Sequence, residues 1–130
     1  MKTLALRTDT EQAFIALYQN ERLVRGLKWQ AGRELSATLH QKIDELLSQE
    51  NATLAPIAGI AVYKGPGSFT GLRIGIASMN ALAYSLDVPI VGTQGDDWLK
   101  KAQDKLTNGE NHHIIQPYYG ADAKTTKPRK

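Results

Sequence analysis

The chain has 130 residues, of which 42% are hydrophobic and 22% charged, and it carries a formal net charge of +3. These values predict one compact domain over residues 1–122 and a basic, disordered tail over residues 123–130. The absence of cysteine excludes disulfide bonds and cysteine-based metal sites, and no segment approaches the roughly 20 apolar residues that cross a bilayer. We therefore expect a cytoplasmic protein that makes no contact with a membrane.

The first part of the chain predicts a meander of strands and then a helix. Short apolar segments at residues 4–7, 13–18 and 23–29 are separated by polar turns and predict antiparallel strands. Between residues 33 and 49, apolar residues recur at helical intervals and predict an amphipathic helix that covers the sheet. These apolar residues are Leu35, Leu39, Ile43, Leu46 and Leu47.

The second part of the chain alternates strands and helices. A mostly apolar strand at residues 57–63 leads through a glycine-rich turn into a helix over residues 68–86, and a short strand follows at 89–92. Start and stop signals predict a third helix within residues 96–109, and residues 113–117 predict a final strand. This order indicates an α/β protein with a mixed sheet of about five strands and three helices, the half-module of the ribonuclease-H-like fold.

The glycine-rich turn is interpreted as a structural element that starts the second helix. Its glycines allow backbone angles that other residues avoid, and its proline stiffens the turn. The serine after the third turn residue is placed to cap the helix. The predicted residues of this structural turn are Gly65, Pro66, Gly67 and Ser68.

The helix that follows is too apolar to have a single buried face. Arg73 is its only charged residue, and the polar positions fall on one narrow stripe. One apolar face is predicted to pack on the sheet, and a second face, notched by small residues, is predicted to accept another helix. The sheet-facing residues are Leu72, Ile76, Met79, Ala83 and Leu86, and those of the second face are Gly71, Ile74, Gly75, Ser78 and Leu82.

Phosphate binding is the alternative interpretation of the same turn, because the N–H groups and dipole of a helix N-terminus favour anions. The spacing disfavours a nucleotide P-loop, since Gly71 is followed by Leu72 and Arg73 rather than by Lys and then Ser or Thr. The glycines also miss the dinucleotide pattern by one residue. A nucleotide- or phosphate-binding protein that uses residues 65–71, with Arg73 as the counter-charge, stays the second hypothesis.

The run GPGSFTGLRIG, followed by an apolar helix and the strand VPIVG, resembles the TsaB (YeaZ) family, and the resemblance extends over most of residues 2–117. It implies the fold of the actin and sugar-kinase superfamily. It also implies a non-catalytic scaffold subunit in the synthesis of N6-threonylcarbamoyladenosine (t6A) in tRNA, which supports a catalytic TsaD-like subunit. A TsaE-like ATPase is a further candidate partner, and contact with tRNA would be indirect or weak.

From this resemblance we expect the TsaD-like subunit to pack on the helices at residues 33–49 and 68–86. Without that partner, the same helices are expected to form a homodimer. No catalytic, metal-binding or cofactor-binding residue is predicted. The expected partner-binding residues are Leu39, Ile43, Gly71, Ile74, Gly75, Ser78, Met79 and Leu82.

Two features depart from the family pattern. The first strand reads LALRTDT and has Arg7 where the family usually has an aspartate, so a metal-nucleotide site would lose its anchoring carboxylate. Asp9 is interpreted as a turn or surface residue rather than as a replacement. The chain also has the length of only the first of the family's two lobes, and one lobe would form no interlobe cleft.

Other patterns indicate little chemistry. The histidines His40, His112 and His113 lack the arrangement of a metal triad, and no carboxylate pair or nucleophile with a neighbouring base stands out. Basic and aromatic residues are not interleaved along the chain, so no stacking platform for single-stranded RNA is indicated. The basic tail is expected to increase solubility rather than to contact tRNA.

Overall fold

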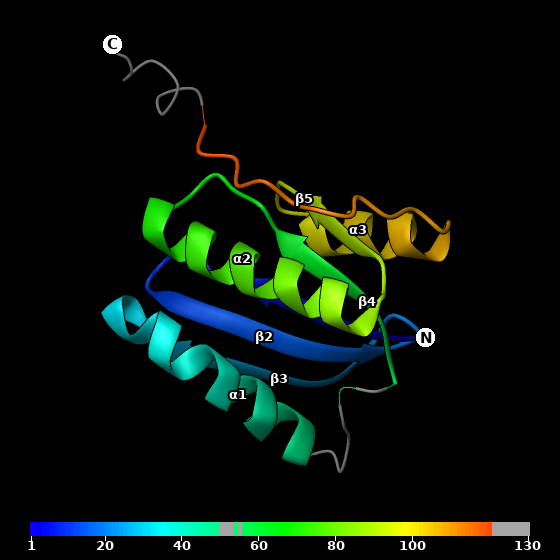
Figure 1. The fold of residues 1–130 in the computed structure, drawn as a ribbon, viewed down its shortest axis with the longest axis horizontal. Helices are drawn as coiled ribbons and strands as arrows, with labels where there is room; N and C mark the ends of the chain where they lie inside the picture. The colour runs from blue at the N-terminus through cyan, green and yellow to red at the C-terminus, as the bar shows by residue number, and fades with distance from the viewer. Residues whose placement is uncertain (50–53, 55, 121–130) are drawn as a thin grey trace.

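The computed structural model describes residues 1–49, 54 and 56–120, and the predicted tail lies outside these residues. Five strands form one mixed sheet in the order β3-β2-β1-β4-β5 (Figure 1). The predicted antiparallel meander and the two later strands, which run parallel to β1, are confirmed. The strands are β1 (Lys2–Arg7), β2 (Gln12–Gln19), β3 (Arg22–Gln30), β4 (Ile57–Tyr63) and β5 (Ile90–Thr93).

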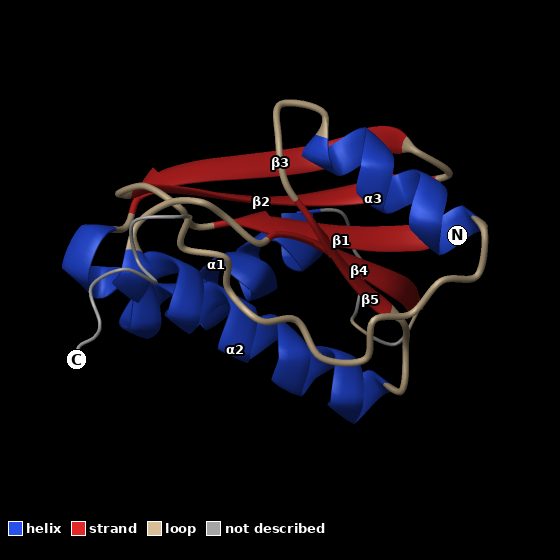
Figure 2. Ribbon diagram, turned by 90° about the horizontal axis from the view of Figure 1, so that it is seen from above, coloured by secondary structure: helices blue, strands red, loops and turns tan. Residues whose placement is uncertain are grey.

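The helices divide between the two faces of the sheet (Figure 2). A short 3-10 helix, η1 (Gly32–Glu34), leads into α1 (Leu35–Gln49), which lies with α2 (Phe69–Leu86) on one face. On the other face, α3 (Trp98–Thr107) packs against β4 and β5. Three helices were predicted, at nearly these positions, and all three are confirmed.

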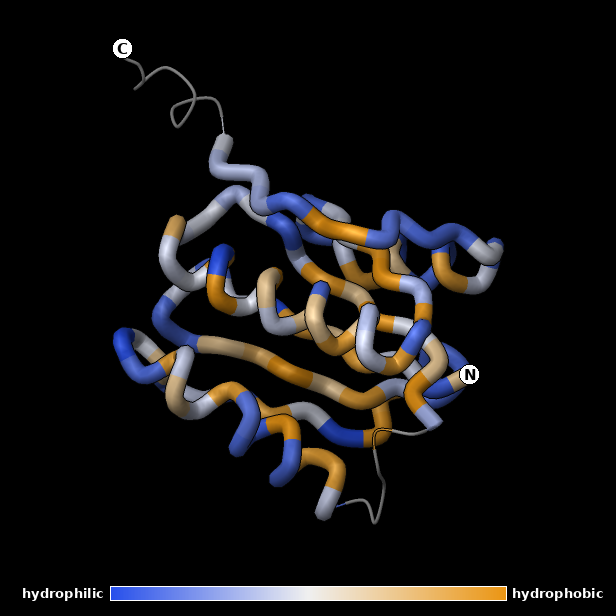
Figure 3. The backbone as a smooth tube through the Cα atoms, viewed as in Figure 1, coloured by the Kyte–Doolittle hydropathy of each residue, from blue (hydrophilic) through white to orange (hydrophobic). Residues whose placement is uncertain are grey.

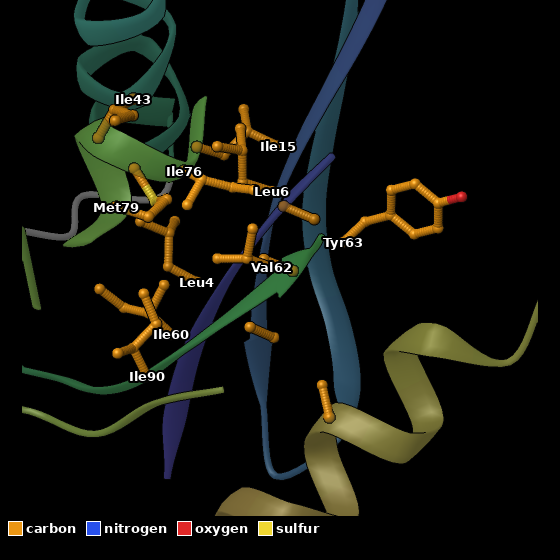
Figure 4. Close-up of a cluster of buried hydrophobic side chains, with 14 of the residues drawn as sticks. Leu4, Leu6, Ile15, Ile43, Ile60, Val62, Tyr63, Ile76, Met79 and Ile90 are labelled. Atoms are coloured by element: carbon orange, nitrogen blue, oxygen red, sulfur yellow. The ribbon is translucent and has the colours of Figure 1, made fainter. Parts of the chain in front are cut away.

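The main core lies between the sheet and the helices α1 and α2 (Figure 4). Leu4 and Leu6 of β1 contribute to it at the centre of the sheet, where both are fully buried. The predicted sheet-facing side of α2 is confirmed, because Leu72, Ile76 and Met79 are at most 2% exposed. Burying such side chains contributes roughly 1.5–3 kcal/mol each, so this layer holds α2 on the sheet.

The predicted strand at residues 113–117 is wrong. The segment from Asn111 to Gly120 crosses the fold without joining the sheet, and we call it the strap. At its centre, the Asn80 side chain of α2 donates to the Ile115 carbonyl and accepts from the Ile115 N–H, each at 2.9 Å. Because a side chain satisfies both backbone groups of Ile115, they are not available for a strand ladder.

The close approach between α2 and the end of β1 depends on glycines. Thr8 donates its hydroxyl hydrogen to the Gly71 carbonyl at 2.8 Å. A Cβ atom at Gly71 would overlap the Thr8 carbonyl oxygen, and one at Gly75 would overlap the Thr8 hydroxyl. The small residues that were predicted to admit a second helix at these two positions therefore admit Thr8, which directly follows β1 of the same chain. Helical periodicity identified the small residues on this side of the helix, but it did not identify the segment that packs against them.

We predict that Gly71→Ala lowers the free energy of unfolding by about 1–3 kcal/mol, the usual cost of overpacking. The added methyl group meets backbone rather than a flexible side chain, and this clash outweighs the higher helix propensity of alanine. Urea denaturation measures the change. Ala77→Ser on the exposed side of α2 is the control and is expected to change stability by less than about 0.5 kcal/mol; equal stability of Gly71→Ala and the parent chain would contradict the packing argument.

Candidate partner interface and the glycine turn

The outward side of α2 carries almost no charge. Its exposed residues include Thr70, Ala77, Ala81 and Tyr84, and Arg73 is the only charged residue in the helix. Figure 3 shows α2 coloured mostly white to orange along its length, unlike the blue stretches of α1. An exposed helix normally presents charged residues to water, so this side of α2 is a candidate contact surface.

The structure places the predicted partner-binding residues in two groups. Leu39, Ile43 and Met79 lie in the chain's own core, at 1%, 3% and 0% exposure, because their helices turn these side chains toward the sheet. Gly75 is buried against Thr8. These four positions are core residues here and do not lie on the outer surface. The other four, Gly71, Ile74, Ser78 and Leu82, are half-buried along α2.

A row of four exposed residues of α2, three of them small, adjoins these half-buried positions. Arg73, Ala77, Ala81 and Ser85 follow at intervals of four, which places them in one row on the helix. The sequence analysis assigned the outer stripe to polar residues and missed the two alanines, although the same four-residue interval could have identified them. Together with Ile74, Ser78 and Leu82, this row forms what we call the α2 outer face.

A shallow groove continues the α2 outer face toward α1. Its volume is about 230 Å³, and it lies where both helices begin, between Arg33 and Leu35 on one side and Thr70 and Ile74 on the other. At this end of the molecule, residues of η1, α1 and α2 therefore line one groove.

The glycine turn is filled by the chain itself. A Cβ atom at Gly65 would overlap the Tyr118 carbonyl of the strap, and one at Gly67 would overlap Asp9. The Ser68 N–H donates to the Asp9 carbonyl at 2.8 Å, and the Gly71 N–H donates to the Ser68 hydroxyl at 3.4 Å. Because these N–H groups already have partners, the arrangement supports the predicted structural turn rather than a phosphate cradle.

Asp9 lies in the turn between β1 and β2, as the sequence suggested, but it is not a surface residue. It is only 8% exposed, and its two carboxylate oxygens accept from Nε and Nη2 of Arg7 at 2.8 and 3.0 Å. The Arg7 guanidinium lies 3.9 Å above the Tyr63 ring, and Tyr63 meets Trp98 edge to face at 5.9 Å between centroids. The sequence could not reveal this cluster, because it joins residues far apart in the chain.

The charges in this cluster are fixed by their partners. The hydrogen bonds that Arg7 donates to Asp9 raise the pKa of Arg7. Burial raises the pKa of Tyr63, whose hydroxyl donates to the Pro66 carbonyl at 3.0 Å. The metal-nucleotide site of the superfamily does not fit here, because a guanidinium stands at the expected carboxylate position and occupies the neighbouring Asp9.

The histidines serve structure or lie at the surface. His112 Nδ1 accepts from the Gly92 N–H at 3.1 Å, so its other ring nitrogen carries the hydrogen and faces Glu110 at 3.0 Å. This contact lowers the pKa of Glu110. His40 and His113 are exposed. Within residues 1–49, 54 and 56–120, no three metal-ligating side chains converge.

Comparisons with known proteins find two related groups, both named for tRNA threonylcarbamoyladenosine synthesis. Residues 29–103 match the family model TsaD, described as tRNA N6-adenosine threonylcarbamoyltransferase. The tRNA threonylcarbamoyladenosine biosynthesis protein TsaB of Haemophilus influenzae is 34% identical over 113 residues, which cover 83% of this chain and 45% of the relative. The chain thus spans about half the length of the curated TsaB relatives that it matches.

Solved structures agree with this result. YeaZ from Pseudomonas aeruginosa superposes with a TM-score of 0.69 at 29% identity, covering 83% of this chain and 50% of that one. RuvC from Thermus thermophilus, at 13% identity and a TM-score of 0.52, covers 95% of this chain and 89% of its own, and shares the fold alone. The predicted ribonuclease-H-like fold is confirmed. None of the helices in the described part of the chain combines the length and hydrophobicity needed to span a membrane.

We predict that titration of the chain with ADP and magnesium gives no saturable binding at micromolar concentrations, because the Ser68 and Gly71 N–H groups have partners within the chain and Gly65 and Gly67 pack against Tyr118 and Asp9. Isothermal titration calorimetry measures this directly. Micromolar binding that disappears in Arg73→Ala would contradict the structural interpretation and favour the phosphate-binding alternative.

Proposed function

Because the chain belongs to the TsaB (YeaZ) family, we propose that it acts in tRNA t6A modification as a non-catalytic scaffold that binds and supports a TsaD-like catalytic subunit. The relatives named TsaB are biosynthesis proteins for this modification. The observation that carries the proposal is the α2 outer face, a nearly uncharged and partly apolar surface on an otherwise ordinary domain. A partner that covers it removes apolar surface from water.

The energetics of such an interface are adequate. Each 100 Å² of apolar surface that is buried contributes roughly 2.5 kcal/mol before the cost of association is subtracted. Ala77 and Ala81 let a facing helix approach closely, and Ile74, Leu82 and Tyr84 supply larger apolar contacts. Since charged groups are scarce, few would lose water in the interface.

A TsaD-like partner is favoured because this chain itself matches the TsaD family model. Two proteins of one fold present equivalent helices, and they can pair about an approximate twofold axis as identical subunits do. A homodimer through the same face is the expected state without the partner, and the two assemblies would exclude each other. A TsaE-like ATPase would then join the pair elsewhere, in the cytoplasm where tRNA is modified.

The non-catalytic part of the proposal is supported by the edge of the sheet where β1 and β4 end. Arg7, Asp9, Tyr63 and Ser68 lie there, and their polar groups bond to one another or to nearby backbone. A catalytic acid, base or nucleophile needs to be available to a substrate. These groups instead hold the turn in place.

We predict that Ala77→Arg weakens association with a TsaD-like subunit at least tenfold, because the long charged side chain enters the centre of the α2 outer face. Leu82→Asp tests the same surface from the side nearer α1. Thr107→Arg adds the same group at an exposed position of α3, on the opposite side of the sheet, and is the matched control. Affinity is measured by surface plasmon resonance, with circular dichroism to verify folding.

If Ala77→Arg and Leu82→Asp both fold and bind the partner with the parent affinity, the α2 outer face is not the interface. Loss of binding in Thr107→Arg alone would assign the interface to the opposite side of the sheet.

A further inference from the structure

The side of the sheet that faces α3 is open along β3 and over the start of β2, whereas Ala16 and Tyr18 further along β2 are buried. α3 packs on β4 and β5, and across the remaining strands Leu23, Gly26 and Lys28 of β3 are exposed. One aromatic residue, Phe14 of β2, lies half-buried on this open area. A half-covered sheet face of this kind is a place where a flat ligand can rest.

Strand register places Phe14 between two cations. Arg7 of β1 is opposite Phe14, and Phe14 is opposite Lys28 of β3. Directly opposed residues project to the same face of a sheet, so the three side chains form one row across the strands. Along the sequence these residues are far apart, and for this reason the sequence analysis found no interleaving of basic and aromatic residues.

The Phe14 ring has a defined position. It lies over Gly26, where a Cβ atom would come within 3.3 Å of Phe14 Cε1. Phe14 and Arg7 contribute to a hollow of about 410 Å³ that is also lined by Gln12 and Lys28 and, from the start of α3, by Trp98. The absence of a side chain at Gly26 thus leaves space for the Phe14 ring. A ligand can reach the ring through the hollow.

The two ends of the hollow carry different charged groups. Asp9 binds Arg7 through Nε and Nη2, which leaves the Nη1 donors of the guanidinium and fixes its plane. Asp96 also lies close enough to act on Arg7 electrostatically. On the far side of Phe14, Lys28 is exposed. The hollow therefore has an exposed positive group at the Lys28 end and an aromatic residue beside it, whereas Asp9 balances the charge of Arg7 at the other end.

This combination matches the chemistry of single-stranded nucleic acid, whose bases stack on aromatic side chains exposed on a sheet while its phosphates meet nearby cations. We propose that the open sheet face binds a nucleotide of single-stranded RNA, with the base on Phe14 and a flanking phosphate at Lys28. The proposal rests on the proposed function, because the tRNA in that role supplies the RNA. It replaces the expectation of indirect or weak tRNA contact with a direct site.

The test uses the full chain and a fluorescein-labelled RNA of ten nucleotides that has no self-complementarity, followed by fluorescence anisotropy. Phe14→Leu keeps an apolar side chain but removes stacking, and it is expected to weaken binding about tenfold, while Phe14→Tyr restores it. Lys28→Ala is expected to reduce the slope of log affinity against log salt concentration by about 0.7, the contribution of one phosphate contact in a single strand.

Arg33→Ala is the matched control, since it removes one exposed positive charge next to α1, away from the open sheet face. All variants keep the basic tail, so a difference between them cannot come from it. Binding of the TsaD-like subunit is measured in parallel and is expected to be unchanged in Phe14→Leu, which separates this site from the α2 outer face.

Four results would overturn the proposal. Three of them are an absence of RNA binding by the parent chain at 50 mM salt, equal affinities of folded Phe14→Leu and the parent chain, and, third, complete displacement of the RNA by an equal concentration of AMP. The third result would assign the hollow to a free nucleotide. The fourth result, an effect of Arg33→Ala as large as that of Lys28→Ala, would show that the binding is only general electrostatic attraction.

Discussion

The packing of α2 against the end of β1 is the contact on which the rest of the structure depends. Gly71 and Gly75 let the helix backbone reach Thr8, which bonds to the Gly71 carbonyl at 2.8 Å. One turn earlier, Gly67 rests on Asp9. These contacts close the glycine turn, and they fix which side of α2 meets the sheet. The side that remains is the α2 outer face.

The same contacts explain why a glycine-rich turn before a helix does not act here as a phosphate site. A phosphate needs N–H groups that point outward and space in front of them. In this chain the space is taken by Asp9 and by Tyr118 of the strap. Arg7 completes the closure, because its guanidinium pairs with Asp9 and covers the Tyr63 ring. The motif that identifies the family therefore has a packing role in this chain.

Local patterns predicted most of the fold, and long-range contacts explain what they missed. Helical periodicity identified α1 and the inner side of α2 because burial acts on every turn of a helix. Residues 113–117 of the strap were predicted as a strand, since the sequence does not show that Asn80 bonds to the backbone of Ile115. Leu39 and Met79 were assigned to a partner interface, because apolar periodicity does not distinguish a residue buried in the chain's own core from one buried by another protein. The row formed by Arg7, Phe14 and Lys28 depends on strand register, which no single segment encodes.

The central claim is that another polypeptide covers the α2 outer face while the open sheet face stays accessible. Carbene footprinting of the chain, alone and mixed with a TsaD-like subunit, tests both halves of this claim in one measurement. The account predicts that labelling of residues 69–85 falls sharply in the mixture and that labelling of residues 22–30 is unchanged. Unchanged labelling of residues 69–85 in a mixture that contains the complex would contradict it.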